Sequence, residues 1–193
     1  MPEPRTVVLA SASPRRRELL SLTGLRFIVD PSDYEEDLLQ ALPPRKLARV
    51  LSQRKAESVA ARHPHAIVIG ADTFIVFEGS LMGKPRSKAE AVAMLRRLSG
   101  RTHLVITGFT ILDVPGKRRR SQSVVTRVTF RHLTDREIAA YVRSGEPMDK
   151  AGAYAIQGRA ALFVKKIAGD YFNVIGLPLC ALAERLRDFG VIL

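Results

Sequence analysis

The sequence contains no tryptophan and a single cysteine, Cys180, and aromatic residues make up only 6% of it. One cysteine cannot form an intramolecular disulfide, and with only four histidines in the chain a structural zinc site is poorly supplied. The shortage of aromatic side chains also leaves little surface on which single-stranded nucleic acid could stack. No apolar run approaches the ~18 residues of a membrane-spanning helix, and residues 1–5 do not resemble a signal peptide. We therefore expect a cytoplasmic protein with no membrane partner.

The composition that remains is that of a globular protein, with 46% hydrophobic and 26% charged residues. A length of 193 residues is typical of one domain, so we predict a single domain over residues 1–193. Lysine and arginine outnumber aspartate and glutamate by 31 to 19, which is a net charge of +12. That charge indicates a polyanionic partner, either a nucleotide phosphate, a nucleic acid or an anionic surface. The basic residues are spread along the chain, and the run at 117–120 follows Pro115-Gly116 as a solvated hairpin turn would.

The hydrophobic pattern predicts strands that alternate with helices, interrupted by one long hairpin of β-branched segments. This order indicates an α/β fold with a mixed sheet. The expected strands are 7–10, 26–29, 66–70, 74–77, 103–112, 123–130 and 161–167, and the expected helices are 16–23, 45–62, 88–98, 135–142 and 177–189.

A candidate phosphate site lies where the first expected strand passes into the first expected helix. Ser13 can cap this helix and Pro14 suits its first turn, so backbone N–H groups and the helix dipole would favour an anion there. Ser11, Arg15 and Arg16 add a hydroxyl and two guanidinium groups. The alternative is an ordinary serine cap with surface arginines.

Two further segments carry charge at positions that suit nucleotide chemistry. Asp72 follows an apolar strand, and an acid at the carboxyl end of a strand could hold a divalent cation or act as a base toward water. Lys84 lies in a Gly-Lys-Pro turn, where a point charge suits a phosphate, and residues 35–37 form an acidic cluster that could bind a metal. A turn aspartate, a solvated lysine and a solvated acidic loop are the alternatives.

The stretch 149–158 is rich in glycine and alanine, so its backbone could approach a ligand closely. Gln157 in this stretch offers a donor and an acceptor that could read the edge of a base, although its amide could equally cap a turn. Tyr171 and Phe172 lie in a second unusual loop, and we expect both to pack in the core.

Taken together and in this order, these segments resemble the Maf proteins, a family of nucleotide pyrophosphatases first described as septum-formation inhibitors. The resemblance extends over nearly the whole chain. The matching stretches are 9–16, 70–73, 83–85, 144–154, 156–158 and 176–179.

The resemblance implies a fold like that of the inosine-triphosphate pyrophosphatases, in which helices flank a long mixed sheet and two lobes surround a central cleft. It also implies hydrolysis of a nucleoside triphosphate to the monophosphate and pyrophosphate with a divalent cation, Mg²⁺ or Mn²⁺, in a homodimer. Arg15, Thr73 and Gln157 resemble the branch that acts on dTTP and UTP. The branch that acts on 7-methyl-GTP has Asp-Gln and Ser-Glu-Gly where this chain has Asp-Thr and Ile-Gln-Gly.

The resemblance also assigns roles to individual residues. Asp72 matches the proton acceptor, and Glu36 with Asp72 matches the acids near the metal. The residues matching the phosphate-binding positions are Ser11, Arg16, Lys55 and Lys84, and those matching the base-selecting positions are Arg15, Thr73 and Gln157. Two other interpretations of the function stay open: a 7-methyl-GTP enzyme of the same family, and a basic nucleic-acid-binding module that has lost its activity.

Overall fold

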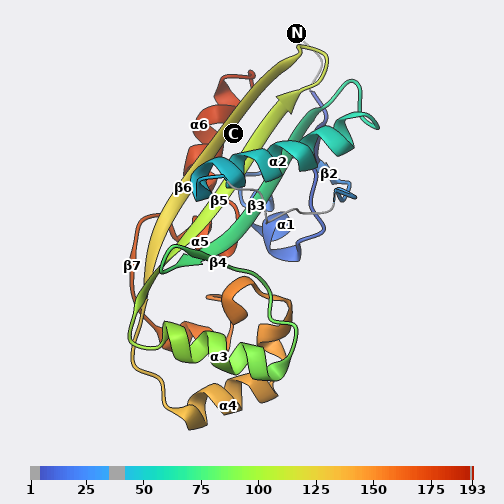
Figure 1. The fold of residues 1–193 in the computed structure, drawn as a ribbon. Helices are drawn as coiled ribbons and strands as arrows, with labels where there is room; N and C mark the ends of the chain where they lie inside the picture. The colour runs from blue at the N-terminus through green and yellow to red at the C-terminus, as the bar shows by residue number, and fades with distance from the viewer. Residues whose placement is uncertain (1–4, 35–41, 192) are drawn as a thin grey trace. The chain divides into compact units, whose positions relative to one another are not determined.

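The structure is a computed structural model that describes residues 5–34, 42–191 and 193. The chain, shown in Figure 1, divides into two compact units. Unit 1 consists of Met1–Asp72, Thr107–Val124 and Gly176–Leu193, and unit 2 consists of Thr73–Ile106 and Val125–Ile175. Within the described residues, no helix is long and apolar enough to cross a membrane.

The elements follow the expected α/β order. The strands are β1 (Val7–Leu9), β2 (Phe27–Val29), β3 (Ile67–Phe77), β4 (Ser80–Met82), β5 (Thr102–Asp113), β6 (Arg118–Phe130) and β7 (Val164–Ala168). The helices are α1 (Pro14–Ser21), α2 (Pro44–Ala60), α3 (Lys88–Leu98), α4 (Asp135–Arg143), α5 (Tyr171–Ile175) and α6 (Leu179–Arg187), with short 3-10 segments η1 (Glu146–Asp149), η2 (Ala151–Ala153) and η3 (Arg159–Phe163).

The strands form a seven-stranded mixed sheet in the order β2-β1-β3-β5-β6-β7, and β4 pairs with β3. β1 runs parallel to both β2 and β3, whereas β4 and β7 run antiparallel to their neighbours. The three long strands β3, β5 and β6 contribute residues to both units. The mixed sheet predicted from the sequence is therefore confirmed.

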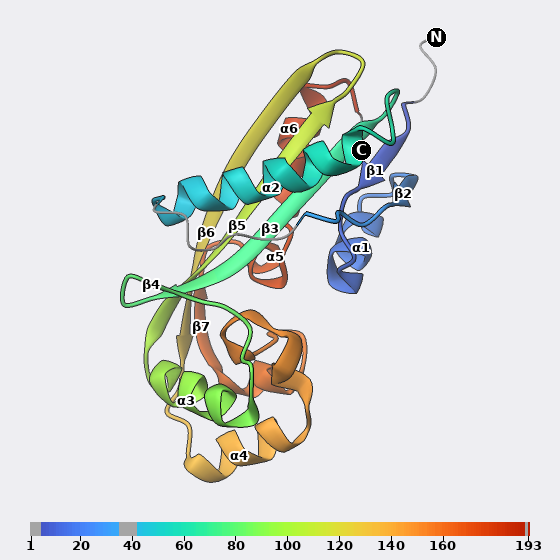
Figure 2. The same ribbon diagram turned by 45° about the vertical axis from the view of Figure 1, so that its right-hand side comes forward.

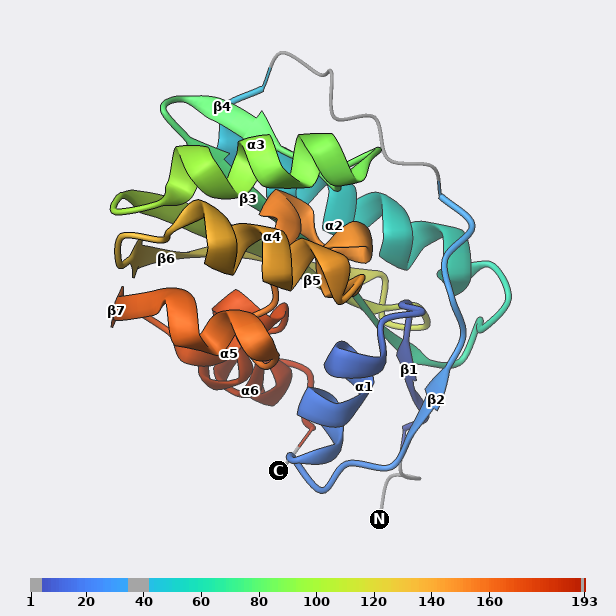
Figure 3. The same ribbon diagram turned by 90° about the horizontal axis from the view of Figure 1, so that it is seen from below.

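In unit 1, helices cover both faces of the sheet. Figures 2 and 3 show α2 lying across one face of the strands and α1 and α6 on the other. The strands supply apolar side chains to both faces, because successive residues of a strand point to opposite sides. Val8 and Val68 pack with Ala56 and Val59 of α2 in one buried cluster.

Two glycines let α2 lie very close to the sheet. A Cβ atom on Gly70 would lie 2.3 Å from the backbone oxygen of Ser52, and one on Gly108 would lie 2.0 Å from that of Ala48. Any larger residue at either position would therefore push α2 away from β3 or β5.

In unit 2, aromatic rings form the centre of the core. Phe130 makes edge-to-face contacts with His103, Tyr154 and Phe163, at centroid distances of 5.1, 4.8 and 6.1 Å. Nε2 of His103 lies 2.8 Å from Oη of Tyr154, so the imidazole has a hydrogen-bond partner inside the core. The helices here begin as predicted, since Ser87 caps α3 and Thr134 caps α4 in a capping box with Glu137.

Burial of His103 should make the protein less stable in mild acid. Burial lowers the pKa of His103 from 6.5 to about 4. Below pH 6.5 the unfolded chain binds a proton that the folded chain does not, so stability is lost as the pH falls from 6.5 to about 4. Between pH 7.0 and 4.5 we expect a loss of about 2.5 kcal/mol, from roughly 1.4 kcal/mol for each pKa unit. Urea unfolding at pH 7.0 and 4.5 measures this loss.

The matched variants for this experiment are His103→Gln and His65→Gln, because His65 is exposed. His103→Gln should remove most of the difference between the two pH values, and His65→Gln should keep it. A His103→Gln protein as acid-sensitive as the wild type would contradict the assignment.

Several local predictions from the sequence were wrong. Asp72 does not follow a strand but lies inside β3, which continues unbroken to Phe77. Residues 161–163 belong to η3 rather than to a strand, because the N–H of Ala161 donates to the carbonyl oxygen of Gly158 at 3.0 Å and closes a turn. Residues 118–120 are the start of β6 and not a turn, and the guanidinium of Arg118 lies 5.1 Å from the ring centroid of Phe189.

Tyr171 and Phe172 were also placed wrongly by the sequence analysis. They begin α5 and are 43% and 37% exposed, although core packing was expected. α5 buries Asn173 and Ile175 instead. The second unusual loop of the sequence analysis thus contains a short helix whose buried face excludes the two aromatic residues.

Candidate active site

Within unit 1, the serine-rich segment after β1 begins the candidate phosphate site. The N–H of Ala10 donates to the carbonyl oxygen of Ile69 at 2.8 Å, so Ser11 leaves β1 alongside the stretch of β3 that leads to Asp72. Ser13 caps α1 as predicted, and its Oγ accepts from the N–H of Arg16 at 3.4 Å. Ser11 is 7% exposed, and its hydroxyl is therefore held close to the protein interior.

Arg16 links this segment to the start of α6. Its Nε donates to the carbonyl oxygen of Gly176 at 2.9 Å, and its Nη1 donates to Oγ of Ser11 at 3.2 Å. These bonds join two of the stretches that carry the family resemblance. Arg15, the neighbouring residue of α1, is partly buried. The structure thus brings Ser11 and Arg16 together and gives Arg16 a structural task besides the predicted contact with phosphate.

The most distinctive feature of unit 1 is a buried ion pair between Lys55 and Asp72. Nζ of Lys55 lies 2.5 Å from Oδ1 of Asp72, and the two side chains are 12% and 4% exposed. The pair follows from the local fold. Asp72 shares a strand face with Gly70, and Lys55 precedes Ala56, which packs against that glycine. Lys55 is therefore no ordinary surface lysine, because it neutralises a carboxylate that would be costly to bury alone.

The metal-binding prediction can be compared with the described residues only in part. Glu36 lies in the segment 35–41, outside the described residues. In the described part of the chain, no three His, Cys, Asp or Glu side chains are grouped as metal ligands. Mg²⁺ is commonly held by one or two carboxylates, with substrate phosphates and water completing its shell. A single carboxylate such as Asp72 fits a cation that arrives with a triphosphate, and does not fit an all-protein cage.

Within unit 2, the turn that carries Lys84 meets the small-residue stretch. The N–H of Gly152 donates to the carbonyl oxygen of Gly83 at 2.9 Å, and Lys84 beside it is exposed. Gly152 has a φ of +66°, and a Cβ atom there would lie 2.4 Å from Cδ1 of Ile75. At Gly152 the backbone is thus closely approached by a side chain of β3, and a close approach to a ligand stays a prediction. A phosphate contact by Lys84 stays a prediction.

The predicted base-selecting residues of unit 2 are Thr73 and Gln157. Thr73 lies in β3 and is partly buried, and Gln157 is exposed in the turn between η2 and η3. This turn is closed by its own backbone, since the N–H of Gly158 donates to the carbonyl oxygen of Ala155 at 3.1 Å. The turn therefore does not need the Gln157 side chain as a cap, which leaves the amide available to a ligand.

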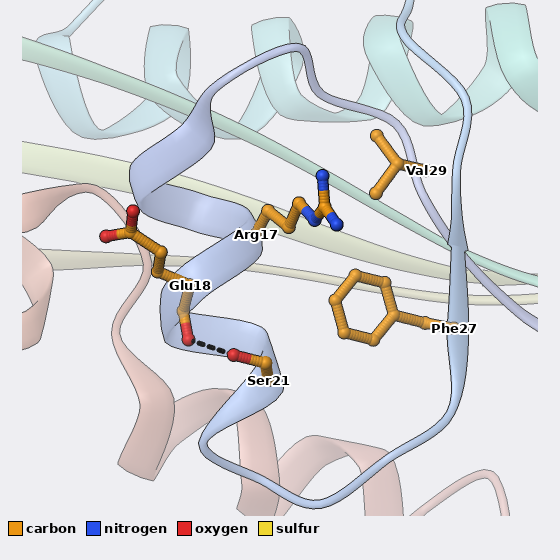
Figure 4. Close-up of a pocket in the computed structure, with 5 residues that line it drawn as sticks. All are labelled: Arg17, Glu18, Ser21, Phe27 and Val29. Atoms are coloured by element: carbon orange, nitrogen blue, oxygen red, sulfur yellow. Dashed lines mark hydrogen bonds between the residues drawn. The ribbon is translucent and has the colours of Figure 1, made fainter.

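A pocket in unit 1 is lined by residues outside the predicted set. Figure 4 shows it between α1 and β2, with the side chains of Arg17, Phe27 and Val29 on its wall. Ser21 also lines it and donates from its hydroxyl to the carbonyl oxygen of Glu18 at 2.7 Å. None of these residues belongs to the predicted site.

Sequence reasoning missed two residues that contact the Gln157 turn, Tyr141 and Glu146. The O–H of Tyr141 donates to Oε1 of Glu146 at 3.0 Å. Tyr141 also accepts from the N–H of Ala155, which precedes Gln157, and Glu146 accepts from the N–H of Arg159, which follows it. The available signal was that Glu146 belongs to the stretch 144–154 that carries the family resemblance.

Comparison with known families decides the relationship that the motifs suggested. The family described as Maf-like protein matches residues 6–189. The chain belongs to the Maf family. Among curated Maf-family relatives, the dTTP/UTP pyrophosphatase of Moorella thermoacetica is 54% identical over 185 residues, which cover 96% of this chain and 95% of that protein. The dTTP/UTP pyrophosphatase of Geobacter metallireducens is 50% identical over 192 residues, with both chains fully covered.

The fold of this Maf-family chain is also found among solved structures. The Ham1 protein of Staphylococcus aureus matches it with a TM-score of 0.54, over 95% of this chain and 99% of that one. The two sequences are only 13% identical, so this likeness concerns the fold alone. The Maf-type α/β fold predicted from the sequence is confirmed, and the central cleft stays a prediction.

Proposed function

We propose that this Maf-family chain hydrolyses dTTP and UTP to the monophosphate and pyrophosphate. The observation that carries the proposal is the buried Lys55–Asp72 pair, in a chain about half identical to dTTP/UTP pyrophosphatases over nearly its full length. A carboxylate held by a lysine on a rigid helix and strand is suited to accepting a proton from a water molecule. By the family resemblance, Arg15, Thr73 and Gln157 correspond to the selective positions of the dTTP/UTP branch.

In the proposed reaction, water adds to phosphorus and the bond between the monophosphate and the pyrophosphate breaks. Asp72 accepts a proton from the attacking water, and Lys55 keeps the carboxylate oriented. Ser11, Arg16 and Lys84 are assigned to the phosphates, whose negative charge cationic side chains offset. A bound divalent cation, Mg²⁺ or Mn²⁺, would supply further neutralisation of the leaving pyrophosphate. Asp72 is the described residue that would hold it, and Glu36 is proposed as the second acid.

Base selection is assigned to Gln157, together with Arg15 and Thr73. The amide of Gln157 has one acceptor and two donor hydrogens, which can match the alternating groups on the edge of uracil or thymine. If the bound base covers the amide and leaves it unpaired, the cost is about 1–3 kcal/mol, which is enough for selection. Rejection of purines requires only that the base-binding site be too small for their second ring.

The test is pyrophosphate release from a panel of canonical and modified triphosphates with Mg²⁺ or Mn²⁺. We expect dTTP and UTP to be hydrolysed faster than purine triphosphates, because of the Arg15, Thr73 and Gln157 set. Equal rates on 7-methyl-GTP and dTTP would refute the branch assignment and keep the reaction class. Absence of pyrophosphate release together with tight DNA binding would favour the nucleic-acid-binding alternative.

The cellular setting is part of the same proposal. We place the enzyme in the cytoplasm, as a homodimer that either removes unwanted nucleotides from the pool or restrains cell division. The lone Cys180 is exposed and free, in keeping with a reducing compartment. Sedimentation of the purified protein tests the homodimer.

A further inference from the structure

The turn that carries Gln157 is held at both ends by side chains from outside it. On the near side, the N–H of Ala155 donates to Oη of Tyr141 at 3.4 Å. On the far side, the N–H of Arg159 donates to Oε2 of Glu146 at 3.1 Å. Gln157 lies midway between these two anchored amides and is exposed.

The two anchoring side chains are joined to each other. The hydroxyl of Tyr141 donates to Oε1 of Glu146 at 3.0 Å, so one chain of hydrogen bonds runs from Ala155 through both side chains to Arg159. Tyr141 is 3% exposed, and its ring lies edge-to-face on Phe163 at 5.1 Å. Burial and the neighbouring Glu146 raise the pKa of Tyr141, so the hydroxyl keeps the proton that it donates.

The turn itself is shaped to receive the carboxylate. A Cβ atom on Gly158 would lie 2.0 Å from Oε1 of Glu146, so this position has no room for a side chain while the carboxylate is in place. Glu146 is held in its turn by Gly145, whose φ is +79°, and by its own N–H, which donates to Oγ of Ser144 at 3.3 Å. Gly158 therefore leaves room for the carboxylate, and residues next to Glu146 hold its backbone in place.

We propose that Tyr141 and Glu146 are positioning residues that fix the Gln157 turn and so set the preference for pyrimidine over purine triphosphates. We call these two residues the clamp. The role of Gln157 in this inference rests on the proposed function, whereas the clamp rests on the hydrogen bonds of unit 2. Free movement of the turn would let the amide adapt to other bases, whereas a turn anchored at both ends holds the backbone of Gln157, and so the reach of its amide, in one place. The cost of a mismatched base then appears as lost affinity.

The experiment uses the full chain with Tyr141→Phe and Glu146→Gln. Tyr141→Phe keeps the ring against Phe163 and removes only the hydroxyl. Glu146→Gln keeps the size of the side chain and removes its charge. The matched controls are Tyr171→Phe and Glu184→Gln, both at exposed positions.

Two readouts are needed, and one does not depend on activity. Hydrogen exchange of the Ala155 amide should accelerate about 5- to 10-fold in Tyr141→Phe, which removes the acceptor of that amide, as loss of a hydrogen bond worth about 1 kcal/mol implies. Exchange of the Arg159 amide should accelerate in Glu146→Gln, which replaces its charged acceptor with a weaker neutral one. The ratio of kcat/KM for dTTP to that for dGTP should fall by a similar factor, mainly through KM, with kcat on dTTP within about twofold of wild type. The controls should change neither readout.

Each other result has a definite meaning. Unchanged amide exchange in both variants would overturn the clamp. Faster exchange with an unchanged dTTP to dGTP ratio, or an equal loss of kcat on every substrate, would show that the clamp serves only stability. A wild-type protein that releases no pyrophosphate from dTTP would refute the proposed function, while the exchange result would still report on the clamp. If Glu146→Gln does not fold, Tyr141→Phe decides the question alone.

Discussion

Replacing Asp72 with asparagine is expected to lower the turnover of dTTP by at least about 100-fold, the lower end of the usual cost of losing a general base. Asparagine has the size of aspartate but cannot accept a proton from water, and it binds a hard cation poorly. KM should change less, since the cationic residues assigned to the phosphates remain. Steady-state kinetics on dTTP and a thermal melt of the same variant measure the two effects.

The matched control for this experiment is Asp113→Asn. Asp113 is also a buried carboxylate of unit 1 paired with a basic side chain, since Arg5 lies 2.7 Å from it and its own side chain is 1% exposed. Loss of that pair should lower stability and leave turnover near the wild-type value. A folded Asp72→Asn enzyme with nearly full turnover would show that another residue accepts the proton, and Glu36 would be the first to examine.

Replacing Gly70 with alanine is expected to destabilise the protein by about 1–3 kcal/mol and to lower turnover as well. The added methyl group would meet backbone atoms of α2, including the oxygen of Ser52 at 2.3 Å, so the helix itself must move. Lys55 lies on the same turn of that helix, and its pairing with Asp72 would be stretched. Urea unfolding and kcat on dTTP are the measurements.

Gly83→Ala is the control for this second prediction, because a Cβ atom on Gly83 has no neighbour within 4 Å and its φ is not in the left-handed region. Its free energy of unfolding should match that of the wild type. A Gly70→Ala protein with wild-type stability would mean that α2 adjusts without cost. Normal stability joined to lost turnover would instead indicate that the helix shift acts on Lys55 alone.

Much of the fold and of the site could be predicted from the sequence because the relevant signals are local. The serine and threonine caps of α1, α3 and α4 hydrogen-bond within four residues, and strand alternation reports burial residue by residue. The order of several short motifs was enough to predict family membership. Arg15 and Lys84 could be named as candidates because a cationic residue in a turn or at the start of a helix by itself suggests a phosphate-binding position.

Tertiary structure alone decided which of these residues meet. Lys55 lies 17 positions from Asp72, and only the close packing that Gly70 permits brings the lysine onto the carboxylate. Asp72 itself belongs to the interior of β3, because pairing with neighbouring strands carries the extended backbone past the polar residues where periodicity alone suggests a break.

The same limit explains the residues that were missed or misplaced. Tyr171 and Phe172 are apolar enough for a core, yet the short helix α5 turns them outward. Nothing in the local sequence around Glu146 indicates its contacts, because Gly158 and the N–H of Arg159 meet its carboxylate only once the chain has folded back. Local sequence determines the elements and the chemical groups they carry, but contacts between distant segments depend on how those elements pack, which no short-range pattern encodes.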